Sequence, residues 1–590
     1  MPEVRARAKR RAAAKPAVTA PPPKAGPRWW MYAAGAGLAL YVVFQAYGPA
    51  LYGPFLFDDT RAPYYLPNFP NDILAWVTGV RPLLMFTYWI NYQLSKEPFG
   101  FHVLNVALHV CNGVLVFFIV RKLLALGNAR GSKDFLLPGF AAAVFLLHPI
   151  QTESVSYVAG RSECLSVLFF FAAFTVFLYR RSAAASWGVA VAVLALSGAA
   201  VASKEHTLVL PGLLLLTDYF WNPGFSFSGI RRNWRIYTPL AAGGLVGLAF
   251  IAKLLAGAPS AGFHIKDLTW YQYFFTECRA FFVYLRLFVF PIGQNLDYDY
   301  SISRNILDHG AIFGLVAILL LAGAAIYFRR QYPLASYGFL VYLLLMAPTS
   351  SFVPIKDALA ERRMYLPMIG LLLIVVAALD RIDLDRLHMG RRKLAAAMGA
   401  VAVILAIATW QRNQVWASDV ALWEDAAHKA PWNARAHFQL AHAYYMTGRF
   451  GAAAASYAET ARLQQPNYDL LVDWGLAYDD AGQPDQAVAK LKQAAALDPS
   501  AHVYSQIARV YAKQSRWPEA LEALAQAAKL DSGYAMIYYY RGGIRAKTND
   551  FSGAVADYQH ALALGVDPSA EPSVRQGLAF AQQQLLRSQR

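Results

Sequence analysis

The first two thirds of the chain consist mainly of apolar segments that are long enough to lie within a lipid bilayer. A helix needs about 20 predominantly apolar residues to cross the hydrocarbon core, and segments of roughly this kind recur with polar connections between them. We expect about eleven spans, some of them short, which predicts a polytopic bundle of membrane helices. Their approximate ranges are 30–50, 101–126, 135–148, 161–179, 184–202, 206–221, 235–256, 310–328, 333–348, 364–380 and 392–411.

The distribution of charge predicts which connections share a side of the membrane. From Arg412 onward the chain has 17 basic and 17 acidic residues, so the net charge of +17 belongs to residues 1–411. Basic clusters follow alternate spans, as expected of cytoplasmic loops, and we expect the basic tail 1–28 to be cytoplasmic as well. We attribute the basic excess to topology and anionic lipid, and no segment resembles a nucleic-acid-binding module. The clusters are Arg121/Lys122/Arg130/Lys133, Arg180/Arg181, Arg231/Arg232/Arg235, Arg329/Arg330 and Arg391/Arg392/Lys393.

One further apolar segment, 270–291, is interpreted differently because it carries Glu277, Arg279 and Arg286. Charged side chains are costly in hydrocarbon, so we expect an amphipathic helix that lies on the outer membrane surface. With an odd number of spans, the C-terminal domain is also extracytoplasmic. The same side then holds the loops 51–100, 149–160, 203–206, 257–309 and 349–363.

The C-terminal third contains an internal repeat. Its small residues Ala441, Gly475, Ala508 and Gly542 are spaced 34, 33 and 34 residues apart, which is the period of the helix–turn–helix tetratricopeptide repeat. The fold class is therefore all-α, a membrane bundle followed by an α-α superhelical solenoid that binds partner proteins along its concave face. A rigid spacer or a dimerisation surface is the alternative. We expect a membrane domain 29–411 and a repeat domain 412–590, with a half-repeat 416–432, repeats from about 434, 468, 501 and 535, and a capping helix 571–590.

Two adjacent acids, Asp58 and Asp59, follow the first span directly. Burial raises the pKa of a carboxyl group toward that of a useful base, and a positioned carboxylate can deprotonate an acceptor hydroxyl as it attacks a sugar carbon. A helix cap or a loop salt bridge explains the pair equally well in isolation.

Further polar residues gather on the second span and at the predicted outer ends of later spans. His102, Asn105, His109 and Asn112 lie on one helical face, where they line a wet cavity or form hydrogen bonds between helices. Basic groups at the membrane surface suit a lipid phosphate, although each alone can be a snorkelling anchor. These outer residues are His148, Glu153, Arg161, Lys204, Glu205, His206, Lys356, Glu361, Arg362 and Arg363.

The order of these motifs resembles that of the transmembrane and tetratricopeptide-repeat O-mannosyltransferase family and its bacterial relatives. Their membrane architecture is similar to that of the protein O-mannosyltransferases, the GT-C fold. The resemblance covers the chain from about residue 50 to the end. It rests on Asp58-Asp59, Arg81-Pro82-Leu83, His102-x-x-Asn105-x-x-x-His109, His148-Pro149-x-x-x-Glu153, Gly160-Arg161, Lys204-Glu205 and Glu361-Arg362-Arg363-x-Tyr365-x-Pro367, followed by the repeats.

The resemblance implies an inverting glycosyltransferase that moves a sugar, such as mannose, from a polyprenyl-phosphate donor to Ser or Thr hydroxyls. The acidic motif of the family maps onto Asp58 and Asp59, as base and substrate-positioning groups, with Asp58 favoured. The repeats would recruit the acceptor protein, and the family fold implies no metal or other cofactor. Donor-binding residues would be Arg161, Lys204, Arg362, Arg363 and His148, and acceptor- or sugar-positioning residues Arg61, Arg81, His102, Asn105, His109, Glu153 and Glu205.

Two other functions remain open at this stage. A transferase can act on a lipid or an envelope polysaccharide, although ligases of that kind have a large late outer loop in place of an acidic first loop. A non-enzymatic anchor that presents a repeat scaffold needs one span and leaves the outer polar residues unexplained. We expect a bacterial inner membrane with periplasmic repeats, and the endoplasmic reticulum is the alternative.

Overall fold

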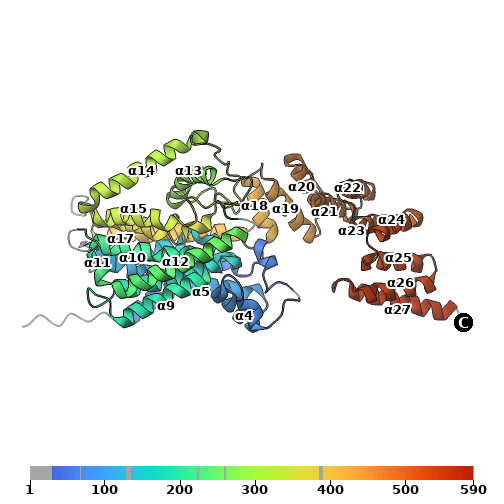
Figure 1. The fold of residues 1–590 in the computed structure, drawn as a ribbon, viewed down its shortest axis with the longest axis horizontal. Helices are drawn as coiled ribbons and strands as arrows, with labels where there is room; N and C mark the ends of the chain where they lie inside the picture. Colours follow the sequence, from blue (N-terminus) through green and yellow to red (C-terminus); the bar gives the residue numbers. More distant parts are fainter. Residues whose placement is uncertain are drawn as a thin grey trace, which may run out of the picture.

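The computed structural model describes residues 29–66, 68–127, 135–221, 225–257, 261–383 and 390–588. The predicted tail 1–28, Arg130 and Lys133 of the basic clusters, and the last two residues of the expected capping segment lie outside these ranges. Within the described residues the regular structure is helical, apart from one isolated bridge between Ala261 and Ile355. A bundle of helices is followed by an arm of shorter paired helices (Figure 1).

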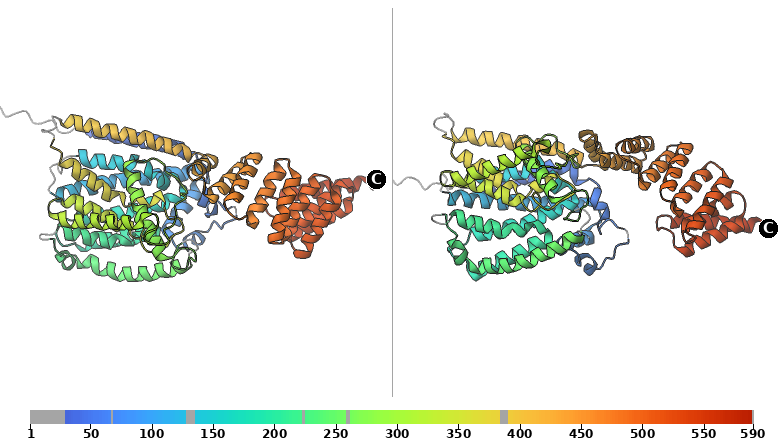
Figure 2. Two further views of the ribbon diagram at one scale, coloured as in Figure 1. Left: turned by 90° about the horizontal axis from the view of Figure 1, so that it is seen from above. Right: turned by 45° about the horizontal axis from the view of Figure 1, so that its top comes forward.

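Each of the ranges expected to span the membrane contains a helix, and these helices run side by side in the bundle (Figure 2). Among the residues that the structure describes, five helices are long and apolar enough to cross a membrane, namely Pro98–Leu126, Val158–Leu178, Trp234–Gly257, Asp308–Arg330 and Arg391–Val415. The chain is thus a membrane protein, while the number of eleven spans stays a prediction. The helices are α2 (Trp29–Leu51), α5 (Pro98–Leu126), α6 (Leu136–Leu147), α8 (Arg161–Leu178), α9 (Trp187–Ser203), α10 (Leu210–Trp221), α12 (Trp234–Gly257), α14 (Ala311–Tyr327), α15 (Pro333–Met346), α16 (Met368–Asp380) and α17 (Arg391–Val415).

Small residues let neighbouring helices approach closely in this bundle. A Cβ atom added to Gly370 of α16 would lie 2.5 Å from the carbonyl oxygen of Gly338 in α15, so the two backbones touch at this point. Such contacts replace the hydrophobic driving force that helices lack inside a lipid bilayer. At the periphery, α12 and α14 leave apolar side chains such as Leu245 and Phe313 exposed, as expected of surfaces that face lipid.

The connections that we predicted to share one side of the membrane meet at the end of the bundle next to the repeats, here called the repeat-facing end (Figure 1). Side chains link them directly: Arg81 pairs with Glu205, Arg362 with Glu153, and the Ala159 N–H donates to Asp59. The short helices at this end are η1 (Phe57–Arg61), α3 (Ile73–Val77), α4 (Pro82–Leu94), η3 (Pro149–Gln151), α7 (Thr152–Ser156), η4 (Val158–Gly160), η5 (Glu205–Val209) and η8 (Glu361–Met364).

Helix α13 (Trp270–Val289) corresponds to the segment that we expected on the membrane surface. Its buried face includes Glu277, which pairs with Arg363 at 3.1 Å, while Arg279 donates to the carbonyl of Ser301. Its charged residues therefore have polar partners. Its location at the membrane surface stays a prediction.

The repeat arm consists of successive antiparallel helix pairs. Close packing explains the small residues of the repeat, because a Cβ on Gly475 would lie 2.8 Å from the Leu491 side chain. The turns at Gly448 and Gly482 have φ of 76°, a left-handed conformation that glycine adopts without strain. The helices are α18 (Asp419–Lys429), α19 (Ala434–Met446), α20 (Phe450–Leu463), α21 (Tyr468–Asp480), α22 (Pro484–Leu497), α23 (Ala501–Lys513), α24 (Trp517–Leu530), α25 (Ala535–Lys547), α26 (Phe551–Leu564) and α27 (Glu571–Ser588).

Candidate active site

Asp59 anchors the first loop inside the protein. The residue is buried, and its carboxylate accepts hydrogen bonds from the Leu56 N–H at 3.0 Å, the Tyr64 hydroxyl at 2.8 Å and the Ala159 N–H at 2.9 Å. Burial raises the pKa of Asp59 to about 7, although these hydrogen bonds act in the opposite direction. With its oxygens engaged, Asp59 is placed to hold the loop against η4.

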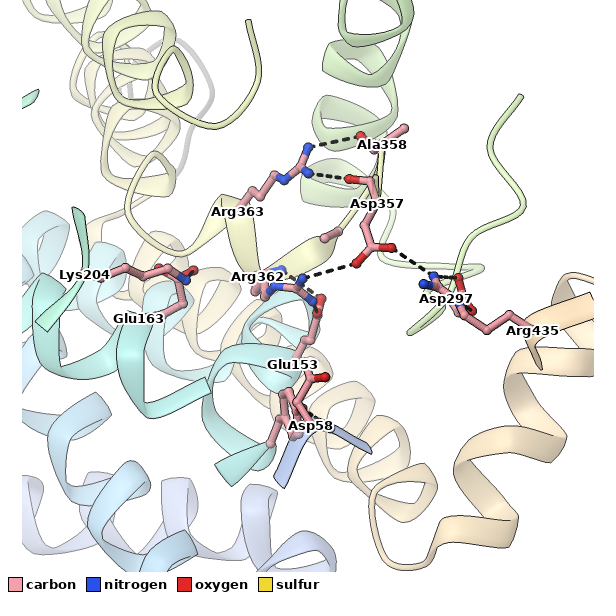
Figure 3. Close-up of polar contacts among 12 residues, drawn as sticks. Asp58, Glu153, Glu163, Lys204, Asp297, Asp357, Ala358, Arg362, Arg363 and Arg435 are labelled. Atoms are coloured by element: carbon pink, nitrogen blue, oxygen red, sulfur yellow. Dashed lines mark hydrogen bonds and ion pairs between the residues drawn. The ribbon is translucent and has the colours of Figure 1, made fainter. Parts of the chain in front are cut away.

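Asp58, by contrast, is exposed. Its backbone N–H donates to the hydroxyl of Tyr157 at 2.8 Å, which fixes the position of the residue. Figure 3 shows Asp58 on the same side of this region as Glu153 and Arg362. The two adjacent acids therefore differ in role, because Asp59 is enclosed by the fold while the Asp58 carboxylate is accessible from outside.

Arg362 lies at the centre of a group of charged side chains (Figure 3). Its Nη1 pairs with Glu153 Oε1 at 2.5 Å, its backbone N–H donates to Glu153 Oε2 at 2.9 Å, and its Nη2 lies 3.7 Å from Asp357 Oδ2. The Arg362 side chain is 30% exposed, whereas that of Glu153 is buried. Arg362 is thus oriented by a buried acid and keeps an accessible surface.

Two more ion pairs stand near Arg362. Glu163, at the start of α8, is enclosed by Lys204, which forms a short hydrogen bond to it, and by His206 at 3.6 Å. Arg81 and Glu205 form a bidentate pair with distances of 3.0 and 2.7 Å. Burial would raise the pKa of Glu205, but the hydrogen bonds and charge of Arg81 hold it at about 2, so this pair is ionised at neutral pH.

A cavity of about 540 Å³ opens beside the Arg81–Glu205 pair. Apart from these two charged residues, most of its wall is apolar. The lining side chains include Trp76, Met85 and Leu255. A cationic group at the edge of an apolar cavity suits a lipid that carries a phosphate.

Arg161, which the resemblance assigns to donor binding, is fully enclosed. Its guanidinium donates to Asn105 Oδ1 at 2.9 Å, to Asn91 Oδ1 at 2.8 Å and to the carbonyls of Thr87 and Phe101. It also lies 4.5 Å from the centre of the Tyr88 ring. These contacts favour a structural role in joining α4, α5 and α8, because a phosphate would have to displace them.

Other predicted site residues are likewise used inside the fold. Asn105 donates to carbonyls of the 155–158 segment, His102 contacts the Gly53 carbonyl, and His109 contacts the Tyr365 hydroxyl at 2.8 Å. His148 Nε2 donates to the Phe288 carbonyl at 2.9 Å. These four side chains stabilise the packing of helices and loops at the repeat-facing end.

Arg363 and Arg61 also lie away from the cluster around Arg362. Arg363 is directed inward, where it contacts Tyr273, Glu277 and the carbonyl of Ala358. Arg61, at the end of η1, is exposed. The structure thus separates the predicted residues into an internal framework, which includes the buried Glu153, and a set of exposed or partly exposed residues around Arg362. This accessible set comprises Asp58, Arg81, Lys204, Glu205 and Arg362 itself.

Several residues of this region escaped the sequence analysis. Tyr157, which positions Asp58, gave no signal in the sequence. Glu163 could have been found, because a carboxylate at the edge of an apolar span needs a partner. Asp357 and Arg435 belong to segments more than 70 residues apart, and only the fold brings them together.

The chain resembles known proteins in both its repeats and its overall sequence. Residues 472–535 and 505–571 match the tetratricopeptide repeat family. Protein O-mannosyl-transferase Tmtc3 of Drosophila melanogaster is 25% identical over 569 aligned residues, which cover 80% of this chain and 59% of the relative. Protein O-mannosyl-transferase TMTC3 of Mus musculus is 25% identical over 608 aligned residues, which cover 89% of this chain and 63% of the relative. The chain is similar in sequence to these protein O-mannosyl-transferases.

The relationship to these O-mannosyltransferases extends through both the membrane bundle and the repeats, since the aligned residues cover most of this chain. The chain spans about 59 to 63% of the length of the relatives that it matches. Among solved structures, MamA is 20% identical, with coverage of 25% of this chain and 85% of its own, at a TM-score of 0.23. This score is too low to support a structural argument.

Proposed function

We propose that this protein is a membrane glycosyltransferase that moves a sugar, such as mannose, from a polyprenyl-phosphate donor to Ser or Thr hydroxyls of an acceptor protein. The observation that carries the proposal is that the exposed Asp58 and the partly exposed Arg362 both lie close enough to Tyr157 to influence it electrostatically. A carboxylate and a cation on one accessible surface are the two groups that such a transfer requires.

In this mechanism Asp58 is the general base. It accepts the proton of the acceptor hydroxyl as the hydroxyl oxygen attacks C1 of the sugar. The bond between C1 and the phosphate oxygen breaks, and the configuration at C1 inverts. Asp58 is favoured over Asp59 because the oxygens of Asp59 already accept three hydrogen bonds inside the protein.

The leaving group is a polyprenyl phosphate, whose negative charge increases as the bond to C1 breaks. Arg362, Lys204 and Arg81 are the cations of this surface, and each is held by an acid, respectively Glu153, Glu163 and Glu205. Preorganised cations stabilise developing charge without having to reorient during the reaction. The cavity beside Arg81 would receive the first isoprenoid units of the donor.

The remaining elements of the proposal concern the acceptor and the cell. The tetratricopeptide arm would bind the acceptor protein, since such arrays present extended binding surfaces. We place the reaction on the extracytoplasmic face, with the repeats in the bacterial periplasm. The basic clusters lie at the opposite end of the bundle, and such clusters are typical of cytoplasmic loops. We expect the transfer to proceed without a divalent metal.

The test is sugar transfer by the purified protein in lipid. Polyprenyl-phosphate sugars are supplied one at a time with envelope proteins as acceptors, and the product is the glycosylated Ser or Thr found by mass spectrometry. Asp58→Asn is compared with Asp72→Asn, an exposed acid of the same loop. We expect the wild type and Asp72→Asn to transfer, and Asp58→Asn to fold but to lose activity.

The acceptor class is decided in the same assay. If the sugar is found on lipid or polysaccharide and not on protein, the acceptor is a lipid or polysaccharide, and the proposed protein acceptor is wrong. Transfer by folded Asp58→Asn at the wild-type rate would refute the role of this residue. Binding of envelope proteins to the arm, with no transfer from any donor of the panel, would favour a scaffold.

A further inference from the structure

A second polar cavity, with a volume of about 300 Å³, lies at the end of the bundle remote from the repeats. Helix α11 (Ser228–Arg232), which contributes to it, is found at that end in Figure 1. The cavity lies between the ends of α5, α8, α10 and α11. Its lining residues are Lys122, Leu126, Leu178, Arg180, Arg181, Ser182, Ala183, Thr217, Asp218, Trp221 and Arg232.

Basic residues outnumber acidic ones in the lining of this cavity. Four of its lining residues are cationic, and Asp218 is its one acid. The Asp218 carboxylate is already used, since it accepts from Arg180 at 3.0 Å, from Asn233 Nδ2 at 2.9 Å and from the Tyr237 hydroxyl at 2.7 Å. Asp218 therefore offsets Arg180, while Lys122 and Arg181 remain in the lining as basic groups that attract an anion.

Two buried donors of the lining residues lack a hydrogen-bond partner. They are the indole Nε1 of Trp221 and the Nε of Arg180. Leaving a buried N–H without an acceptor costs free energy, and most such groups in folded proteins have a partner. Both nitrogens are buried, so an anion bound in this cavity would contact chiefly the surrounding cations Lys122 and Arg181.

We infer that this cavity binds the phosphate diester headgroup of an anionic phospholipid. The cations would contact the phosphate oxygens, with Arg181 offering a planar pair of donors and Lys122 a point charge. Leu126, Leu178 and Trp221 supply an apolar wall that suits the first carbons of a lipid better than a free ion. Basic pockets between membrane helices are known sites for acidic headgroups.

The proposal is independent of sugar transfer, because the cavity and the candidate active site lie at opposite ends of the bundle. It is tested on the full-length protein, delipidated in detergent, by native mass spectrometry with phosphatidylglycerol and phosphatidylcholine of identical acyl chains. We expect phosphatidylglycerol to remain bound at a concentration at least about tenfold lower than phosphatidylcholine, a difference of roughly 1.4 kcal/mol.

Removing two cavity cations with the double variant Lys122→Gln/Arg181→Gln should abolish this preference. The matched control Arg330→Gln/Lys393→Gln removes two basic residues that lie at the same end of the bundle but do not line the cavity. This control should retain the preference for phosphatidylglycerol. Arg181 is exposed, so Arg181→Gln alone provides a variant whose folding is not at risk. Its affinity for phosphatidylglycerol should fall by about threefold or more.

Three results would overturn the inference. Equal affinity for the two lipids would exclude recognition of the acidic headgroup. An equal loss of affinity for phosphatidylglycerol in the control variant would show that the overall positive charge of this end of the bundle, and not the cavity, attracts the lipid. Displacement of phosphatidylglycerol by an equal concentration of inorganic phosphate would assign the cavity to a free anion.

Discussion

Arg435, in helix α19 of the repeat arm, forms an ion pair with Asp357, which precedes η8 of the membrane bundle. The distance from Arg435 Nη2 to Asp357 Oδ1 is 2.9 Å, and the same guanidinium binds Asp297 through Nε at 2.6 Å. The other oxygen of Asp357 lies 3.7 Å from Arg362. A chain of charged groups thus connects the repeat arm to the arginine that we propose binds the donor phosphate (Figure 3).

Replacing Arg435 with glutamine should weaken donor binding. Without Arg435, Asp357 loses a cationic partner and is free to compete with the donor phosphate for Arg362. We expect the KM for the polyprenyl-phosphate sugar to rise by about twofold to fivefold, the effect of one partly exposed ion pair, with kcat less affected. Arg462→Gln is the matched control, because Arg462 pairs with Glu459 on the arm itself. Equal KM values in both variants would show that the junction does not influence the donor site.

Replacing Asp58 with asparagine should reduce kcat for sugar transfer by at least about 100-fold, because the acceptor hydroxyl would lose its general base. The variant should fold normally, since the Asp58 side chain is exposed. Initial rates at saturating donor, together with thermal unfolding in detergent, provide the measurement. A smaller loss in a folded Asp58→Asn protein would assign the base elsewhere.

Asp59 should instead influence stability, and its effect should depend on pH. The folded protein keeps a proton on Asp59 up to pH about 7, while the unfolded chain loses it near 3.8. Between these values the folded state binds more protons, so the free energy of unfolding falls as pH rises. We expect the melting temperature to decrease from pH 5 to pH 7.5 by more in the wild type than in Asp59→Asn. Other titrating groups contribute equally to both proteins. Parallel curves of melting temperature against pH would therefore contradict the prediction.

Gly160 should not tolerate a side chain. An added Cβ would lie 2.6 Å from the carbonyl oxygen of Ser154 and 2.9 Å from that of Glu153. Gly160→Ala should therefore destabilise the protein by about 1 to 3 kcal/mol and disturb the acid that orients Arg362. Gly188→Ala, at a helix position with open space around its Cβ, is the control. Thermal unfolding of both variants measures the difference, and equal melting temperatures would refute it.

Removal of divalent metal should leave sugar transfer unchanged. The proposed chemistry uses cationic side chains, Arg362 foremost, to stabilise the phosphate leaving group. Activity is compared before and after treatment with a chelator, followed by addition of Mg²⁺ or Mn²⁺. A loss that either ion restores would require a metal site in the mechanism.

The local patterns in the sequence predicted the type of each element well. Hydrophobic length indicated helices such as α5 and α17, because a bilayer requires an apolar segment of a given length whatever its neighbours are. The repeat period has an equally local cause. Gly475 is small because its own repeat packs Leu491 against it. The number of eleven membrane spans does not follow from this reasoning, because the length of a short helix does not show whether it crosses the membrane.

Roles within the site depended on contacts between distant segments. In the sequence, Asp58 and Asp59 are equivalent neighbours, and Arg161 is as suitable for a phosphate as Arg362. Only the fold encloses Arg161 among Asn91, Asn105 and backbone carbonyls and leaves Arg362 partly exposed. Burial and pairing, which decide whether a charged group is available for a ligand, are properties of the tertiary structure.

By itself the sequence determined the helical class, the apolar segments, the repeats and the residues from which a site could be built, because these follow from periodicity and hydrophobicity along the chain. The tertiary structure decided which residues form an internal framework, which remain accessible, and how Arg435 of the repeats reaches Asp357 of the bundle. The physical reason is that electrostatic and hydrogen-bond interactions act over a few ångströms in space, whatever the separation of the partners in sequence.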